Sequence, residues 1–388
     1  MKTVFSFLLL FFSVVVHAQK FYVVGAVSGK NGLLSASSID ATKLTHVIYK
    51  SVGIVHNRVA FNDSTSINDI KNLNTLKALK QMNPELKVLI SVGGAHYTSE
   101  FKEATSTEES RELFTASVIS FIKKHQLDGI ELDWVMTPKG KFQNMYDPND
   151  HYNYALLIDD LRFAMNEVGG VLIDGKLSNY VLCVTGSHKR QYLMFSKFRF
   201  VIDQIDFITL QTFSYKVEIL SGGGVSPSSI SGHHTNMFAS RADAWPRRSA
   251  DETIKEYKQH GINANKLVLG IAAYGQEWTN VHDEQHGLCQ MTDGRINGDI
   301  PYKNISTSYL KNSAYKKYWD KHAKASYLFN EENKQFVSYE DKRSIRKKTK
   351  YVRKNKLAGV VFNECQQDEN SHLLKGVKQG LSFIRLPL

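Results

Sequence analysis

Residues 127–135 read Leu-Asp-Gly-Ile-Glu-Leu-Asp-Trp-Val, and this run decides the fold. Successive side chains of a strand point to opposite faces, so Glu131, Asp133 and Val135 share one face. In a closed barrel of parallel strands this face points inward. Its last residue then lies at the carboxyl-terminal mouth, where such barrels place their chemistry. The run therefore predicts a strand whose inward face carries two carboxylates, Glu131 and Asp133, and ends in Val135.

Similar short apolar runs recur along the whole chain. They are rich in Val and Ile and too short for helices, so each predicts a strand. The eight runs are Phe21–Val27, Thr45–Val52, Leu86–Val92, Leu127–Val135, Tyr180–Thr185, Gln204–Thr212, Lys266–Ala273 and Leu357–Phe362. Helical patterns lie between them at Ser110–His125, Tyr152–Val168, Ala250–His260 and Lys342–Asn355. Eight strands alternating with helices predict an α/β protein with a (β/α)8 TIM barrel.

The interval between the last two strands is too long for one crossover. It contains turn signals at Asp293-Gly294 and Asn297-Gly298 and strand signals at Ser326–Phe329 and Gln335–Tyr339. We expect an inserted α+β subdomain at about residues 276–339, between strands seven and eight. Residues 19–388 otherwise form one barrel domain.

Composition narrows the class of protein. The 388 residues are 42% hydrophobic and 22% charged, which argues against a largely disordered chain. Lys and Arg number 49 and Asp and Glu 38, giving a net charge of +11. This excess permits attraction to anionic glycans, nucleic acid or membranes without choosing among them. The three cysteines, Cys183, Cys289 and Cys365, exclude a disulfide scaffold and leave at least one thiol unpaired or intermolecular.

The first residues have the pattern of a secretory signal. Lys2 precedes an apolar run, Val4–Val16, and Val16-His17-Ala18 places small residues where a signal peptidase cleaves. A membrane anchor needs about 20 apolar residues, more than this run provides. We expect residues 1–18 to be removed and the protein to be secreted. In a eukaryotic host, Asn62 and Asn304 are acceptors for glycosylation.

Several motifs occur together in the order of a known family. Ser91-Val92-Gly93-Gly94 and Asp128–Val135 resemble strands three and four of the glycoside hydrolase family 18 chitinases, which read S-x-G-G and D-G-x-D-x-D-x-E. Thr45–Tyr49 resembles strand two, Leu269–Gly275 strand seven, and Val337–Asp341 the stretch before strand eight. The resemblance covers nearly the whole mature chain, including the insertion.

The resemblance implies a mechanism whose acid this chain lacks. The family uses a Glu at the end of strand four as general acid, the acetamido group of the sugar as nucleophile, and an Asp that orients this group. Asp133 retains the orienting residue, and Val135 replaces the acid. A valine has no proton to donate, and general acid catalysis contributes about 10²–10⁴-fold in rate.

Other family positions also depart from the pattern. Strand six reads about M-T-Y-D in the family and Gln211-Thr212-Phe213-Ser214 here, so Phe213 replaces a Tyr that bonds the acetamido carbonyl. The Trp floor of strand eight aligns with Asn363, or with Phe362 after a one-residue slip. Ser51 replaces an aromatic residue, and Gln276 a basic one. The ligand-binding positions implied by the resemblance are Gly93, Gly94, Asp133, Gln211, Tyr274, Asn363 and Glu364.

Three functions are compatible with these residues. The leading hypothesis is a secreted, catalytically inactive chitinase-like protein that binds a chitin-like or other glycan, or a protein partner. The first alternative is a glycosidase or deacetylase that uses Glu131, Asp133 or Glu364 in a new role. The second is a structural or signalling protein without a ligand. We expect no cofactor, no nucleic-acid partner and no membrane span, and the oligomeric state stays open.

Four further features have a functional and a structural interpretation. The adjacent His233 and His234 are weak candidates for metal ligands, because they lie beside a Ser/Gly-rich loop. Trp278 and Trp245 either replace the lost floor or pack in the core. The basic run 342–350 either recognises an anionic glycan or forms the solvated face of a helix. We favour the solvated face, with Ile345, Thr349 and Val352 packed inward.

Overall fold

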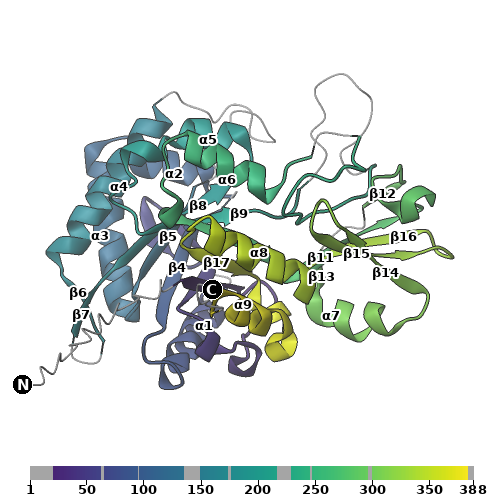
Figure 1. Cartoon of the computed structure of the whole chain (residues 1–388). Helices are drawn as coiled ribbons and strands as arrows, with labels where there is room; N and C mark the ends of the chain where they lie inside the picture. The colour runs from purple at the N-terminus through teal and green to yellow at the C-terminus, as the bar shows by residue number, and fades with distance from the viewer. Residues whose placement is uncertain are drawn as a thin grey trace, which may run out of the picture.

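Eight parallel strands close into a barrel (Figure 1). They are β1 (Tyr22–Ser28), β2 (His46–Val55), β4 (Lys87–Gly93), β5 (Gly129–Asp133), β8 (Val181–Ser187), β9 (Phe207–Gln211), β10 (Leu267–Ala272) and β17 (Gly359–Asn363). Each pairs with the next in this order, and β1 pairs with both β2 and β17 to complete the closure. The predicted TIM barrel is therefore confirmed.

The computed structural model describes residues 21–62, 65–94, 96–134, 149–173, 176–215, 229–244, 247–295 and 299–382. The expected signal peptide, Val135 and Trp245 lie outside the described residues.

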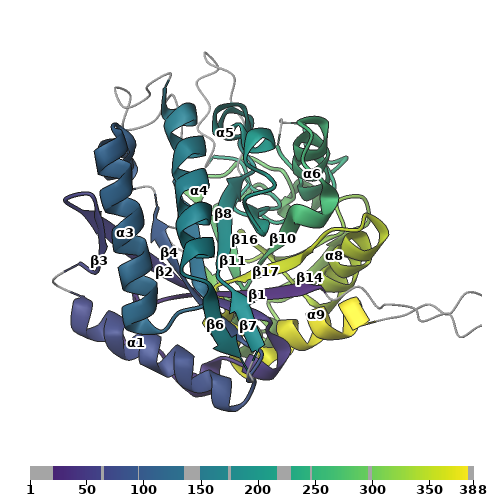
Figure 2. The same cartoon turned by 90° about the vertical axis from the view of Figure 1, so that its left-hand side faces the viewer.

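Helices surround the barrel, and Figure 2 shows α1, α3 and α4 outside its strands. Their bounds are α1 (Ser66–Ala78), α2 (Thr98–Thr105), α3 (Glu108–His125), α4 (Asp150–Glu167), α5 (Arg190–Ser196), α6 (Ala250–Gln259), α7 (Tyr302–Thr307), α8 (Lys342–Lys354) and α9 (His372–Ser382). The four helices expected from the sequence are α3, α4, α6 and α8. Among the described residues, no helix combines the length and the apolar character needed to cross a bilayer.

An antiparallel sheet stands beside the barrel, as expected for an insertion between strands seven and eight (Figure 1). It consists of β11 (Tyr274–Thr279), β12 (Gly294–Arg295), β14 (Tyr315–Asp320), β15 (Ala325–Asn330) and β16 (Gln335–Tyr339), and β13 (Ile300–Pro301) pairs with β11. Its small core includes Trp278, Tyr327, Phe329 and Phe336. Trp278 is thus a packing residue of the inserted sheet.

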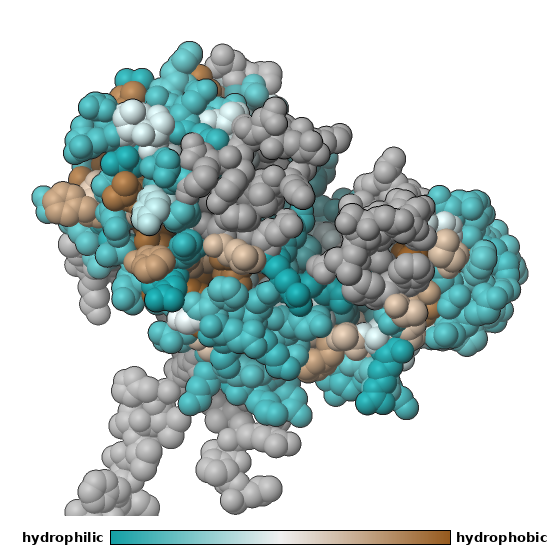
Figure 3. Space-filling model, turned by 90° about the horizontal axis from the view of Figure 1, so that it is seen from above, coloured by the Kyte–Doolittle hydropathy of each residue, from teal (hydrophilic) through white to brown (hydrophobic). Residues whose placement is uncertain are grey.

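Two hairpins complete the fold. The short strand β3 (Arg58–Ala60) folds back on β2 through a turn in which His56 and Asn57 both have positive φ. The strands β6 (Gly170–Ile173) and β7 (Lys176–Asn179) form a separate two-stranded sheet. The surface seen from above is mostly hydrophilic, with hydrophobic residues scattered over the larger lobe (Figure 3).

Local sequence explains where α3 and α8 begin. Thr107 and Ser110 form a capping box at the start of α3, and Asp341 and Ser344 form one at the start of α8. Each box satisfies backbone N–H groups that have no partner within the first turn of the helix. Both helices can therefore begin sharply after a loop.

Helix α8 contains the basic run and differs from the expected solvated face at one residue. Ile345, Thr349 and Val352 are buried as predicted. Lys348 is also buried, and its ammonium contacts Glu340 and donates to Thr235 Oγ1 at 2.8 Å. Burial lowers the pKa of Lys348, against the charge of Glu340. This lysine therefore joins the helix to Glu340, which follows β16, and to Thr235 instead of facing solvent.

Candidate functional site

The inward face of β5 meets a lysine from β2. Lys50 Nζ lies 3.3 Å from Glu131 Oε2 and 3.8 Å from Asp133 Oδ2. Glu131 is fully buried, and its other oxygen accepts a hydrogen bond from Thr209 Oγ1 at 2.5 Å. The inward orientation predicted for Glu131 and Asp133 is thus what the structure has. The outward residue Trp134 stacks on Phe101 with a centroid distance of 5.0 Å.

Charge decides the direction of the pKa shift at Lys50, and burial decides it at Asp133. Burial alone would lower the pKa of Lys50, but Glu131 and Asp133 outweigh it and raise that pKa above its ordinary value. Burial raises the pKa of Asp133. The charge of Lys50 lowers this pKa and the charge of Glu131 raises it, and the pKa of Asp133 remains above its ordinary value. Lys50 is therefore a firmly charged counter-ion and is not a nucleophilic amine.

Two glycines shape the rim next to Asp133. Gly93 and Gly94 both have a φ of +104°, a conformation that favours glycine. A Cβ on Gly93 would lie 2.3 Å from Phe101 and 2.9 Å from the carbonyl oxygen of Asp133. The Gly94 N–H donates to that carbonyl at 2.7 Å. These glycines allow the rim to approach the backbone of Asp133, which is a structural role.

Phe213 follows β9 and faces the start of the inserted sheet. Its ring meets Tyr274 edge to face, with centroids 6.0 Å apart. The Tyr274 hydroxyl lies 2.9 Å from Ser214 Oγ, and Gln276 Nε2 donates to Ser214 Oγ at 3.3 Å. The hydroxyl of Tyr274 is thus already bonded within the protein, in a group of polar side chains that Gln276 extends to Asp299 Oδ1 at 3.2 Å.

Gln211 is the last residue of β9, and its backbone contacts His188. Its carbonyl oxygen accepts a hydrogen bond from His188 Nδ1 at 3.0 Å. His188 also packs edge-on against Tyr215, with centroids 4.9 Å apart. Burial lowers the pKa of His188 to about 4, against the effect of this hydrogen bond. The histidine is therefore neutral at pH 7.

Asn363 and Glu364 end β17. Asn363 pairs in register with Ala26 of β1 and Ala272 of β10. Glu364 Oε1 accepts a hydrogen bond from Lys30 Nζ at 2.9 Å, and Gln366 and Gln367 both donate to Oε2 at 3.1 Å. Glu364 is consequently held by three neighbours at the rim.

Of the histidine pair, His234 contacts one of these residues and His233 contacts Asp320. His233 Nε2 is 3.3 Å from Asp320 Oδ2, and His234 packs against Tyr274 with centroids 5.4 Å apart. Within the described ranges, no three His, Cys, Asp or Glu side chains are arranged to hold a metal ion. The described cysteines Cys183, Cys289 and Cys365 are free thiols.

Sequence reasoning missed the two lysines that contact the carboxylates. Lys50 lies inside the apolar run Thr45–Val52, where a charged residue is unusual, and this was the available signal. Its partners could not be assigned, because β2 reaches β5 only across β4. Lys30 lies in a polar loop and gave no signal.

Comparisons with known proteins place these features in a family. The sequence profile described as "Glycosyl hydrolases family 18" matches residues 20–368. Chitinase A1 of Niallia circulans is 30% identical over 323 residues, covering 80% of this chain and 44% of that protein. An endochitinase of Manduca sexta is 24% identical, covering 92% of this chain and 65% of that protein. The chain thus spans about half to two thirds of the length of these relatives.

Solved structures agree with the sequence comparison. A family 18 N-acetylglucosaminidase from Paenibacillus barengoltzii has a TM-score of 0.77 and 31% identity, covering 93% of this chain and all of that chain. A chitinase-like agglutinin from Robinia pseudoacacia has a TM-score of 0.75 at 21% identity, covering 92% of this chain and 99% of that chain. At this lower identity, the likeness to the agglutinin concerns the fold alone.

Proposed function

Because the chain belongs to glycosyl hydrolase family 18, we propose that it is a secreted chitinase-like protein that binds its target without cleaving it. The target is a glycan related to chitin or a protein partner. Export rests on the signal-like residues 1–18. The absence of cleavage rests on Val135, which replaces the general acid, and on the ion pairs of the remaining carboxylates.

The contacts of Lys50 carry the proposal. An acid catalyst must hold a proton and deliver it to the glycosidic oxygen. Lys50 lies beside both Glu131 and Asp133, and Lys30 contacts Glu364. A neighbouring ammonium favours the ionised form of a carboxylate. Each of the three carboxylates that the enzymatic alternative would use is therefore paired with a lysine.

Hydrolysis assays test the proposal directly. We expect the purified protein to release no fluorophore from a chitobioside or chitotrioside above the rate in buffer. The Asp133→Asn variant should behave identically, because there is no activity to lose. Turnover by the wild type that disappears in Asp133→Asn would overturn the proposal.

One observation favours a second candidate, a glycosidase that uses Asp133 as its acid. The pKa of Asp133 is raised by burial and by Glu131, although Lys50 opposes the change. Glycosidases keep their acid protonated by raising its pKa in this way. Such an enzyme would show a rate that falls as pH rises through the pKa of Asp133, and Lys50→Met would extend its activity to higher pH.

Glycan and protein targets are separated by parallel binding assays. The N-acetylglucosaminidase relative makes N-acetylglucosamine oligomers the first glycans to test. We expect a glycan array, or a pull-down from the secreted fraction of the host, to identify a target. The Asp133→Asn variant should still bind this target. No saturable ligand in either assay would favour a structural protein.

A further inference from the structure

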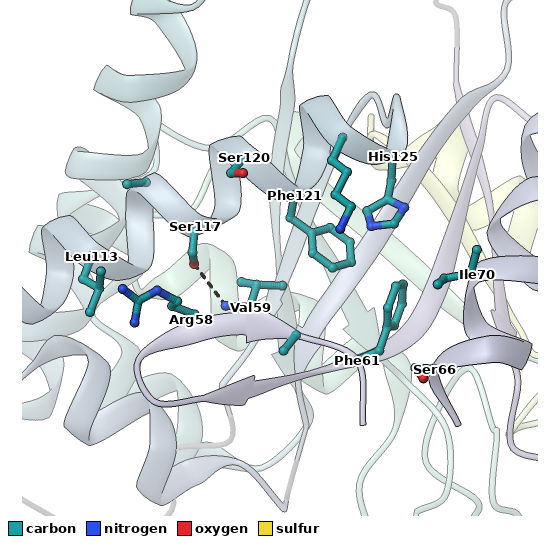
Figure 4. Close-up of a pocket in the computed structure, with 13 residues that line it drawn as sticks. Arg58, Val59, Phe61, Ser66, Ile70, Leu113, Ser117, Ser120, Phe121 and His125 are labelled. Carbon is teal, nitrogen blue, oxygen red and sulfur yellow. Dashed lines mark hydrogen bonds between the residues drawn. The ribbon is translucent and has the colours of Figure 1, made fainter. Parts of the chain in front are cut away.

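A groove of about 610 Å³ lies between α3 and the short strand β3, outside the barrel strands (Figure 4). One side is α3, the other is the strand β3 with the start of α1. Ser117 Oγ of α3 accepts a hydrogen bond from the Val59 N–H of β3 at 3.0 Å, which fixes the floor of the groove. Cavities of this size are typical of ligand sites.

The groove is lined mostly by apolar groups. Phe61, Phe121 and His125 form a cluster of rings at one end, with centroid distances between 4.5 and 5.5 Å. Leu113 lies at the other end (Figure 4). Ile70 borders the ring cluster, and 41% of its surface is exposed. This apolar surface has no protein layer over it in the described chain.

The charged side chains of the groove all have the same sign. Arg58 lies beside Leu113 at one end (Figure 4), and Lys124, which precedes His125 on α3, acts electrostatically on that histidine of the ring cluster. No Asp or Glu is among the lining residues. Within the part of the chain that the structure describes, neither Arg58 nor Lys124 forms an ion pair. A ligand carboxylate can therefore bind at either end without displacing a carboxylate of the protein.

His125 responds to the positive charge at its end of the groove. Burial lowers the pKa of His125, and the charges of Lys124 on α3 and Lys77 on α1 lower it further. The other groups packed on its ring are the uncharged rings of Phe61 and Phe121. An anion bound beside His125 would raise the pKa of this histidine, so the pKa reports whether the groove is occupied by an anion.

We propose that the groove binds an extended, acidic and apolar peptide segment of a partner protein. Lys124 follows Leu113 by eleven residues of α3, which is about 16 Å of helix. An extended peptide covers this length with about five residues. The segment that fits has an acidic residue at each end and aliphatic or aromatic residues between them.

The charges at both ends favour a peptide over other ligands. A fatty acid has one carboxylate and would satisfy only one end of the groove. The lining contains no Asp, Glu, Asn or Gln, whereas glycan sites use such side chains to bond sugar hydroxyls. The groove is separate from Lys50, Glu131 and Asp133, so this inference does not depend on the proposed function of the barrel mouth.

Fluorescence anisotropy with a labelled peptide, Glu-Leu-Phe-Leu-Glu, tests the proposal on the full-length mature protein. We expect saturable binding that weakens as salt is added, and much weaker binding of the twin peptide Lys-Leu-Phe-Leu-Lys. Arg58→Glu and Lys124→Glu should each weaken binding of the acidic peptide about tenfold, because reversal replaces an attraction by a repulsion. The matched control is Lys123→Glu, an exposed neighbour on α3 outside the groove, which should change affinity less than twofold.

Two further measurements complete the test. The pKa of His125, followed by NMR, should rise when the acidic peptide binds. Ser120→Trp, which fills the groove without changing charge, should abolish binding while the melting temperature stays within a few degrees of the wild type. Equal losses in Lys123→Glu and Lys124→Glu would overturn the proposal. So would displacement of the peptide by dodecanoate, which would identify a lipid site.

Discussion

The ammonium of Lys50 lies 3.3 Å from Glu131 Oε2 and 3.8 Å from Asp133 Oδ2, inside the barrel. One lysine therefore serves two carboxylates that would otherwise repel each other at close range. The charges of Glu131 and Asp133 raise the pKa of Lys50 although burial disfavours its charged form, whereas burial raises the pKa of Asp133. This cluster supports both the stability of the barrel and the proposed absence of catalysis.

Replacing Lys50 by Met should destabilise the protein by about 3 kcal/mol at pH 7, because it leaves two buried carboxylates uncompensated. One of them then takes up a proton, so its folded-state pKa rises above the unfolded value. A raised pKa means that the folded variant binds more protons, so its free energy of unfolding falls as pH rises. Urea unfolding at pH 5 and pH 7 measures this dependence.

The control for this variant is Lys30→Met, which removes the partner of Glu364. The Lys30 side chain is 56% exposed, so its ion pair should contribute less than about 1 kcal/mol. Equal losses in the two variants would mean that the cluster around Lys50 has no special role in stability.

Restoring the missing acid should be insufficient for activity. Val135→Glu supplies a carboxyl group at the family position, but Phe213 cannot donate a hydrogen bond to an acetamido carbonyl and Asn363 offers no aromatic floor. We expect no hydrolysis of a chitobioside above background. Clear turnover by this variant, absent when Asp133→Asn is added, would show that the sugar site is intact.

The buried pair of α8 gives a second stability prediction. Lys348 and Glu340 are both fully buried, so Lys348→Met leaves a buried carboxylate without its partner. Such losses cost about 3–5 kcal/mol. Lys347→Met is the matched control, because Lys347 is the exposed neighbour on the same helix and should change stability by less than about 0.5 kcal/mol. Thermal unfolding of the two variants should differ by several degrees; equal shifts would contradict the prediction.

The sequence predicted the barrel well because its strands are short apolar runs, which are hard to mistake. All eight expected strands overlap the barrel strands of the structure. The helices α1, α2, α5, α7 and α9 were missed; α2, α5 and α7 have only 8, 7 and 6 residues, and α1 is polar. Helices of this kind are stabilised by packing on the sheet more than by their own sequence.

The site was predictable only in its strand-bound residues. Alternation along β5 gave the inward direction of Glu131 and Asp133. The ion pairs of Lys50 and of the buried Lys348 were not predicted, because a lysine is almost never fully buried without a partner and the sequence pattern identified no partner for either. Both partners are set by tertiary structure: Glu131 across β4, and Glu340 eight positions before Lys348 and beyond the start of α8.

Acid should destabilise the protein partly through His188. Its folded pKa is about 4, below the ordinary value, so between about pH 6.5 and pH 4 the unfolded chain holds a proton that the folded chain lacks. Stability is therefore full above this window and is lost as pH falls through it, by roughly 2–3 kcal/mol. Denaturation at pH 7 and pH 4.5 should show a smaller loss for His188→Gln than for the wild type. An identical pH dependence would contradict this assignment.

The last prediction concerns the affinity of the barrel mouth for chitohexaose. A family member that retains the floor Trp and the strand-six Tyr should bind this oligosaccharide far more tightly, since Asn363 and Phe213 replace these residues here. Stacking on an aromatic face and a buried hydrogen bond contribute about 1–2 kcal/mol each. Their joint loss weakens binding by roughly 30- to 1000-fold.

Neither Trp278 nor the hydroxyl of Tyr274 compensates for this loss of affinity. Trp278 is buried in the core of the inserted sheet, and the Tyr274 hydroxyl is already bonded to Ser214. Calorimetry combined with tryptophan fluorescence should therefore detect no saturable one-to-one binding of chitohexaose below about 30 µM, if the relative binds near 1 µM. Binding at low micromolar concentration would show that the mouth is a working glycan site built from different residues. In that case Asp133→Asn and Tyr274→Phe would identify which polar groups hold the sugar.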